Sequence, residues 1–151
     1  LPSEVQISPE LANRAIKAHK RPHPAVKALK VLKECKPRSA SWRAAGTDSS
    51  DGLIESIRGI CQSSNCQAVL SKSSLLKDPD WPKNPNWNDW VLYGGEDYEL
   101  ILSLPKKWAE KLSKQLKSAR IIGFTRKGKP KIFWDNLEEI NIDQQSLFQH
   151  Y

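Results

Sequence analysis

Residues 47–53 read Thr-Asp-Ser-Ser-Asp-Gly-Leu, a polar turn between a short strand predicted over residues 39–46 and a helix that begins near Gly52. Apolar residues recur every three or four positions in the predicted helix, which gives it one buried face made of Leu53, Ile54, Ile57, Ile60 and Cys61. A strand that turns directly into an amphipathic helix predicts helices layered on a sheet.

The segments on either side extend this pattern. Two helices are predicted before the turn, one opened by Ser8 and Pro9 and the other by Pro24 and ended at Lys36-Pro37. After the turn, Asn65 is a plausible helix C-cap, and strands are expected over residues 67–70 and 100–102. The proline- and tryptophan-rich residues 77–88 predict a surface loop.

The C-terminal third predicts one more helix and two more strands. The helix starts at Pro105 and carries an apolar stripe of Trp108, Leu112, Leu116 and Ala119. The strands, over residues 121–125 and 131–134, are joined by a turn around Gly128. Residues 1–151 are thus predicted to form a single α/β (α+β) domain in which helices cover at least one face of a mixed β-sheet.

Composition narrows the functional classes. No stretch is apolar enough to span a bilayer, and an odd number of cysteines, three, favours a reducing cytoplasm over a disulfide framework. The net charge of +7 fits either an anionic partner or a basic solvated surface. Because the lysines are spread along helices and no nucleic-acid-binding motif is present, we expect neither a nucleic-acid nor a membrane partner.

The turn at residues 47–53 is the first candidate site. Asp48 and Asp51 flank two serines at the start of a helix, and Mg²⁺ prefers hard oxygen ligands such as carboxylates and phosphates. The helix N-terminus offers N–H groups to phosphate oxygens. The hydroxyl of Ser50 can donate to the same phosphate. Serine, aspartate and glycine are equally typical helix caps, so the spacing alone leaves both interpretations open.

Residues 94–99, Gly-Gly-Glu-Asp-Tyr-Glu, form the second candidate site. Paired glycines allow a sharp turn or a close approach of the backbone to a ligand. Acidic side chains directly before a buried strand are costly unless they face solvent, a cation or donors on a substrate. An acidic turn and a binding loop both fit this pattern. The three histidines have no metal-ligand spacing, and we assign them no role.

Together the two motifs resemble one family. Asp-x-Ser-Asp-Gly-Leu at residues 48–53, followed by Gly-Gly-Glu-Asp-Tyr-Glu-Leu at residues 94–100, is similar to thiamine-monophosphate kinase, of the aminoimidazole-ribonucleotide synthetase-like superfamily. Phe148-Gln149-His150-Tyr151 also resembles the family's histidine-aromatic ending. The chain begins at Leu1 and has no methionine, which favours a piece of a longer protein. The resemblance identifies that piece as the C-terminal domain of a two-domain kinase, without its N-terminal domain.

The resemblance implies an enzyme that transfers the γ-phosphoryl group of ATP to thiamine monophosphate with Mg²⁺. By motif position, Asp48 and Asp51 would hold magnesium, Ser50 would contact ATP, and Glu96 would bind the thiamine moiety. Phe148 or Tyr151 would lie against the substrate's ring. No catalytic side chain is implied. The isolated piece is expected to be inactive, and the parent is expected to form a homodimer through its N-terminal domain.

The chain departs from the family pattern at several positions. Ser49 stands where the family usually has an aliphatic residue, and Leu147 stands where a glycine is common. Two alternatives to the kinase remain: another ATP-dependent small-molecule synthetase of the superfamily, or a basic binding module for nucleic acid or an acidic partner. The second would show a steep salt dependence of binding.

Overall fold

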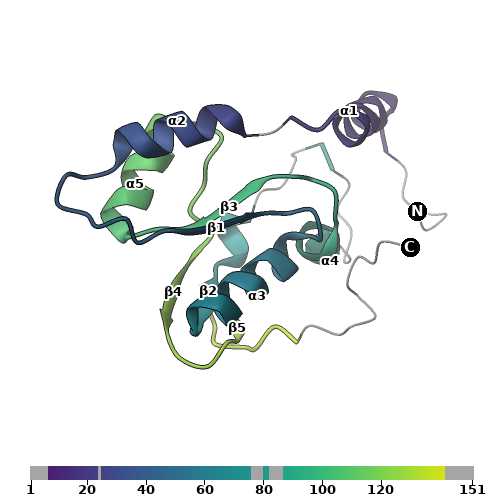
Figure 1. Cartoon of the computed structure of the whole chain (residues 1–151). Coiled ribbons are helices and arrows are strands. Elements are labelled where there is room, and N and C mark those ends of the chain that lie inside the picture. Colours follow the sequence, from purple (N-terminus) through teal and green to yellow (C-terminus); the bar gives the residue numbers. More distant parts are fainter. Residues whose placement is uncertain (1–6, 24, 76–79, 82–86, 142–151) are drawn as a thin grey trace.

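The computed structural model describes residues 7–23, 25–75, 80–81 and 87–141 (Figure 1). Helices and strands alternate over most of this length. In chain order they are α1 (Pro9–Lys20), α2 (Val26–Cys35), β1 (Ala45–Asp48), α3 (Leu53–Ser64), β2 (Cys66–Leu70), the short 3₁₀ helix η1 (Lys72–Ser74), α4 (Trp87–Tyr93), β3 (Leu100–Ser103), α5 (Lys106–Gln115), β4 (Gly123–Lys127) and β5 (Ile132–Trp134). The predicted mixture of helices and sheet in one layered fold is confirmed.

The strands form two small sheets in place of the single mixed sheet that was expected. β1 and β3 pair antiparallel, with Asp48 opposite Leu100. The second sheet has the order β4-β2-β5 and is mixed, because β2 runs antiparallel to β4 and parallel to β5. A contact of 3.3 Å between the hydroxyls of Ser103 and Thr125 connects β3 to β4.

The two strands predicted on either side of Gly128 are present as β4 and β5, but they are not neighbours in the sheet. Each strand pairs with a different edge of β2. Ala68, Val69 and Leu70 of β2 are at most 3% exposed. A buried strand needs hydrogen-bond partners for its N–H and C=O groups on both sides, which places β2 in the centre.

Several boundaries also differ from the prediction. β1 begins at Ala45, because local turns such as the one between Ala40 N–H and the Pro37 carbonyl occupy the residues before it. α5 ends at Gln115, four residues before Ala119. α4 takes in residues 87 and 88 at the end of the expected loop, of which residues 77–79 and 82–86 lie outside the described part of the chain.

The main core lies between α3 and the second sheet. Ile54, Ile57 and Cys61 of α3 pack with residues of β2, α4 and β5, among them Leu70, Leu92 and Trp134. Burial and the neighbouring Cys66 raise the pKa of the Cys61 thiol to about 12, so it stays protonated as a small apolar side chain. Asn65 ends α3 in the left-handed conformation, as the sequence predicted.

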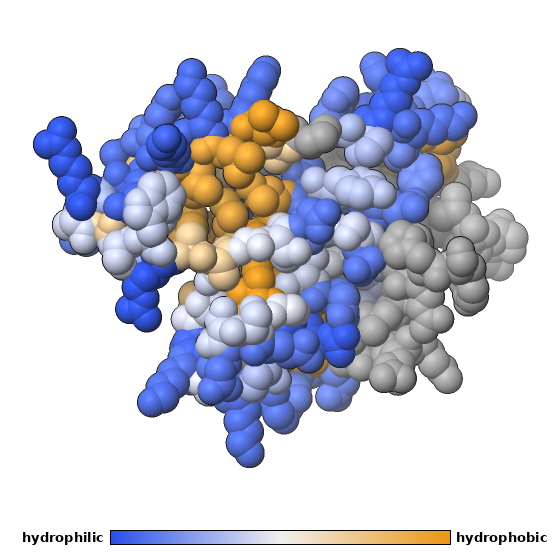
Figure 2. Space-filling model, viewed as in Figure 1, coloured by the Kyte–Doolittle hydropathy of each residue, from blue (hydrophilic) through white to orange (hydrophobic). Residues whose placement is uncertain are grey.

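A second, smaller core joins α2 to α5. It is centred on Cys35, Trp108 and Leu112. Trp108 is fully buried, and its indole N–H donates to the Leu32 carbonyl at 2.9 Å. Figure 2 shows that apolar surface also gathers beside α2, which carries the exposed Val26 and Leu29 on its outer side. Within the described residues, no helix is both long and apolar enough to cross a bilayer.

Replacement of Trp108 tests this second core. Trp108→Ala should lower the free energy of unfolding by about 3–5 kcal/mol, because it leaves a cavity between α2 and α5. Trp42 contacts the Trp108 ring edge-on but is 65% exposed, so Trp42→Ala is a matched control that should cost less than about 1 kcal/mol. Urea unfolding followed by circular dichroism measures both. Equal losses in the two variants would contradict this account of the packing.

Candidate functional site

The first acidic turn connects the end of β1 to the start of α3. The N–H of Gly52 donates to the Ser49 carbonyl at 3.1 Å, which closes a tight turn over residues 49–52. Asp48 and Asp51 have exposed side chains. The Ser50 hydroxyl lies 3.4 Å from Asp48 Oδ1, so the turn presents two carboxylates and a hydroxyl to solvent.

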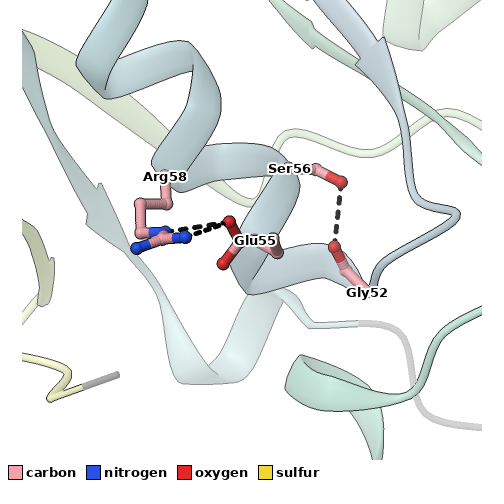
Figure 3. A network of polar contacts seen from close by, with 4 residues as sticks. All are labelled: Gly52, Glu55, Ser56 and Arg58. Carbon is pink, nitrogen blue, oxygen red and sulfur yellow. Dashed lines mark hydrogen bonds and ion pairs between the residues drawn. The ribbon is translucent and has the colours of Figure 1, made fainter. Parts of the chain in front are cut away.

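Two buried serines, Ser49 in the turn and Ser56 on α3, stabilise this turn from the protein interior. Ser49 and Ser56 are the buried polar residues of the described chain, at 3% and 8% exposure. The Ser56 hydroxyl lies 2.7 Å from the Asp48 carbonyl and 2.8 Å from the Gly52 carbonyl, and Figure 3 shows the second of these contacts. A buried hydroxyl costs free energy unless it is hydrogen-bonded. Here its bonds fix the two ends of the turn.

The first turns of α3 carry an ion pair next to this network (Figure 3). Arg58 Nε donates to Glu55 Oε1 at 2.9 Å, three residues apart on the helix. The other carboxylate oxygen, Oε2, is buried and has no hydrogen-bond partner within the described residues. Glu55 is thus directed towards the protein and takes no part in the exposed acidic turn.

The second acidic segment, residues 94–99, leads from α4 into β3. The N–H of Gly94 still donates to the Trp90 carbonyl, so the segment starts as a continuation of α4. Glu96 and Tyr98 then adopt positive φ angles of 65° and 52°. Non-glycine residues adopt such angles at an energetic cost, and those that persist cluster at functional sites.

Two hydrogen bonds join the acidic turn to the acidic segment. The Glu96 N–H donates to the Ser50 carbonyl at 2.7 Å, and the Glu99 N–H donates to the Ser49 hydroxyl at 2.9 Å. Residues nearly fifty positions apart in the chain therefore form one site, continuous with the pairing of β1 and β3. The two hydrogen bonds bring the backbones of both acidic segments together.

Gly52 lies where the two segments approach most closely. Its φ of 93° is one that residues with a side chain rarely adopt. A Cβ atom at this position would also lie 3.2 Å from the carbonyl oxygens of Tyr93 and Gly94. The glycine is needed both for the conformation of the turn and for its contact with the second segment.

One basic residue faces the acidic segment. His19 Nδ1, on α1, lies 3.5 Å from Glu96 Oε2. Desolvation by the surrounding chain raises the pKa of Asp97, and the nearby His19 opposes that shift. This contact could not be predicted from the sequence, because His19 and Glu96 belong to elements that are far apart in the chain.

The structure brings together four of the six residues that the sequence predicted for the site. Asp48, Ser50 and Asp51 lie on the turn, and Glu96 lies on the segment bonded to it. Phe148 and Tyr151 lie outside the described residues. Ser49, which appeared only as a departure from the family pattern, is the buried acceptor for the Glu99 N–H.

The donors present fit part of a magnesium site. Among the described residues, no group of three or more histidine, cysteine, aspartate or glutamate side chains could enclose a metal ion. Two exposed carboxylates on one turn are nevertheless the kind of ligand set that Mg²⁺ uses when it keeps several waters and binds substrate phosphates.

Similar proteins of known name include several thiamine-monophosphate kinases. No protein-family model matches the chain. A thiamine-monophosphate kinase of Prochlorococcus marinus is 47% identical over 141 residues, which are 93% of this chain and 42% of that protein. Another, of Synechococcus elongatus, is 34% identical and covers 98% of this chain and 45% of its own length. The chain spans less than half the length of these relatives.

Solved structures of similar fold agree. AaThiL complexed with AMPPCP and TMP superposes with a TM-score of 0.65 and 27% identity, over 88% of this chain and 40% of that chain. Thiamine-monophosphate kinase of Stenotrophomonas maltophilia K279a superposes with a TM-score of 0.66 over 89% and 42%, and at 22% identity it supports the fold alone. The fold is therefore that of the aminoimidazole-ribonucleotide synthetase-like superfamily. Over the part of its relatives that it spans, the chain belongs to the thiamine-monophosphate kinase family.

Two glycines of this region provide a matched pair of substitutions. Gly52→Ala should lower the free energy of unfolding by about 2 kcal/mol, because it combines a left-handed conformation with the close carbonyls of Tyr93 and Gly94. Gly59, on α3, has open space around its Cα, so Gly59→Ala should raise stability by about 0.5–1 kcal/mol. Urea unfolding of both variants measures the contrast. Equal effects would show that the turn does not require Gly52.

Proposed function

We propose that the chain is the C-terminal domain of a two-domain thiamine-monophosphate kinase whose N-terminal domain lies outside these 151 residues. The parent transfers the γ-phosphoryl group of ATP to thiamine monophosphate and produces thiamine diphosphate. The observation that carries this proposal is the joining of the two acidic motifs by the hydrogen bonds from Glu96 to Ser50 and from Glu99 to Ser49. Family membership supports it.

The acidic turn forms the nucleotide side of the site in this proposal. Asp48 and Asp51 hold magnesium, which when bound neutralises phosphate charge, and the Ser50 hydroxyl contacts ATP. Gly52 caps α3 without a side-chain hydrogen bond, which leaves the first N–H groups of the helix free of a side-chain cap. Such a helix start favours phosphate oxygens. The remaining ligands come from the N-terminal domain.

The acidic segment forms the acceptor side. Glu96 accepts hydrogen bonds from the thiamine moiety, which carries an aminopyrimidine with N–H donors. The Glu96 backbone has a positive φ angle, and its N–H donates to the Ser50 carbonyl. Together these hold the Glu96 carboxylate in a defined place. Phe148 or Tyr151, beyond the described residues, lies against the substrate's ring.

Phosphoryl transfer to thiamine monophosphate requires that the two substrates be aligned more than it requires a general acid or base. The acceptor is already a phosphate oxygen at neutral pH, so no residue has to remove a proton from it. Phosphoryl transfer depends on alignment and on charge neutralisation, and the protein supplies mainly these two. Exposed carboxylates and a hydroxyl on a rigid turn suit that task.

The parent enzyme is a cytoplasmic homodimer in this proposal, and its subunits meet through their N-terminal domains. The apolar surface beside α2, with Val26 and Leu29 exposed, supports the presence of further chain that packs against this domain. The free cysteines of the described chain fit a reducing compartment.

The ligand roles are tested in the parent enzyme by removal of one charge at a time. Asp48→Asn and Asp51→Asn should each lower kcat by at least about a hundredfold, because an amide binds magnesium and phosphate-bound metal far less well. Asp135→Asn, an exposed carboxylate on the turn after β5, is the control and should leave kcat unchanged. Thiamine diphosphate formation measures all three. Full activity of the two site variants would refute the assignment.

The isolated 151-residue chain tests the division of the site. It should show no turnover of ATP with thiamine monophosphate and should bind ATP·Mg²⁺ only weakly, because it supplies two of the metal's ligands. Calorimetric titration with ATP·Mg²⁺ and a coupled assay for ADP measure binding and turnover. Turnover by the chain alone at the rate of the parent would contradict the need for a second domain.

A further inference from the structure

We propose that His19 is a positioning residue that fixes the Glu96 carboxylate for the thiamine moiety, so that α1 forms one wall of the acceptor site. This inference rests on the proposed role of Glu96. It adds a residue to the site that neither of the two acidic motifs contains.

Glu96 is held at both of its ends. Its backbone N–H donates to the Ser50 carbonyl at 2.7 Å, and its φ of 65° is a positive angle that a regular strand does not have. At the other end, Oε2 lies 3.5 Å from His19 Nδ1. The Glu96 side chain remains 33% exposed, so the second oxygen, Oε1, is left for a donor on the substrate.

The place of His19 is set by contacts of α1 that do not involve Glu96. Leu11 is 2% exposed and anchors the first half of the helix. Arg14 Nη2 lies 2.7 Å from Asp80 Oδ2, which ties the middle of α1 to the segment before α4. Figure 1 shows α1 at the same end of the molecule as α4 and far from α5. His19 therefore lies beside the acidic segment on a helix whose other contacts, at Leu11 and in the Arg14–Asp80 ion pair, do not involve Glu96.

The acidic segment pairs selectively with this one basic side chain. Lys17 and Lys20 share the last turn of α1 with His19, but among the described contacts only His19 lies within 4.0 Å of a carboxylate of the segment, and this contact is an ion pair only when His19 is protonated. The charge of His19 also acts on Asp97, the next carboxylate along the chain. A carboxylate that is oriented before binding loses less freedom when a substrate arrives, which lowers the substrate's KM.

Kinetics of the parent enzyme test the role. His19→Ala should raise KM for thiamine monophosphate by about three- to tenfold, the size of one exposed contact to a charged group. KM for ATP and kcat should change by less than about twofold. His19→Asn keeps an N–H donor near the place of Nδ1 and should restore most of the affinity. Lys17→Ala removes a charge from the same turn and should have no effect.

A double substitution separates positioning from a general effect of α1. In a Glu96→Ala background, His19→Ala should cause no further rise in KM, because the group that it positions is gone. Three results would overturn the proposal: an unchanged KM in His19→Ala, an equal rise in Lys17→Ala, or equal rises for both substrates together with a lower Tm. The last would show that His19 only stabilises α1.

A measurement on the 151-residue chain does not depend on the reaction. The ¹³C resonance of the Glu96 carboxylate should shift in His19→Ala and stay in place in Lys17→Ala. If the parent makes no thiamine diphosphate, the proposed function fails while this shift still reports whether His19 holds Glu96. An unshifted resonance overturns the positioning role whatever the parent catalyses.

Discussion

Ser49 accepts the Glu99 N–H at 2.9 Å while almost wholly buried, and the exposed part of the site depends on that bond. It fixes the end of the acidic segment, and the bond from Glu96 to Ser50 fixes its middle. Because β1 and β3 pair directly beside these bonds, a shift in strand register would separate the two motifs. The position of the site therefore depends on the pairing of β1 with β3, although apart from Asp48, at the end of β1, its side chains belong to loops.

The sequence predicted much of this arrangement from local chemistry. The apolar face of α3 and the cap at Asn65 follow from periodicity and from left-handed backbone preference, which are properties of a few neighbouring residues. The acidic turn at Asp48 and Asp51 and the segment at Glu96 were located for the same reason. Their meeting came from the resemblance to a family, since spacing along the chain says nothing of distance in space.

What the sequence missed depends on contacts between distant elements. β2 pairs with β4 at one edge and with β5 at the other, an order that the short connection around Gly128 does not predict. His19 looked like a solvated helical residue, whereas its Nδ1 lies 3.5 Å from Oε2 of Glu96, a residue far away in the chain. Ser49 stood out in the sequence only as a departure from the aliphatic residue that is usual in the family. Hydroxyl burial can only be seen once the second segment is in place.

The buried polar side chains of the described residues gather at one place, the acidic turn. A domain stabilised by packing alone has no reason to bury a hydroxyl, since an apolar residue of similar volume costs less. The described chain buries two polar residues, Ser49 and Ser56, and both lie under the acidic turn. Their bonds reach the carbonyl of Asp48, that of Gly52 and the N–H of Glu99. The buried serines therefore hold the backbone of the turn, and with it the places from which the exposed carboxylates project.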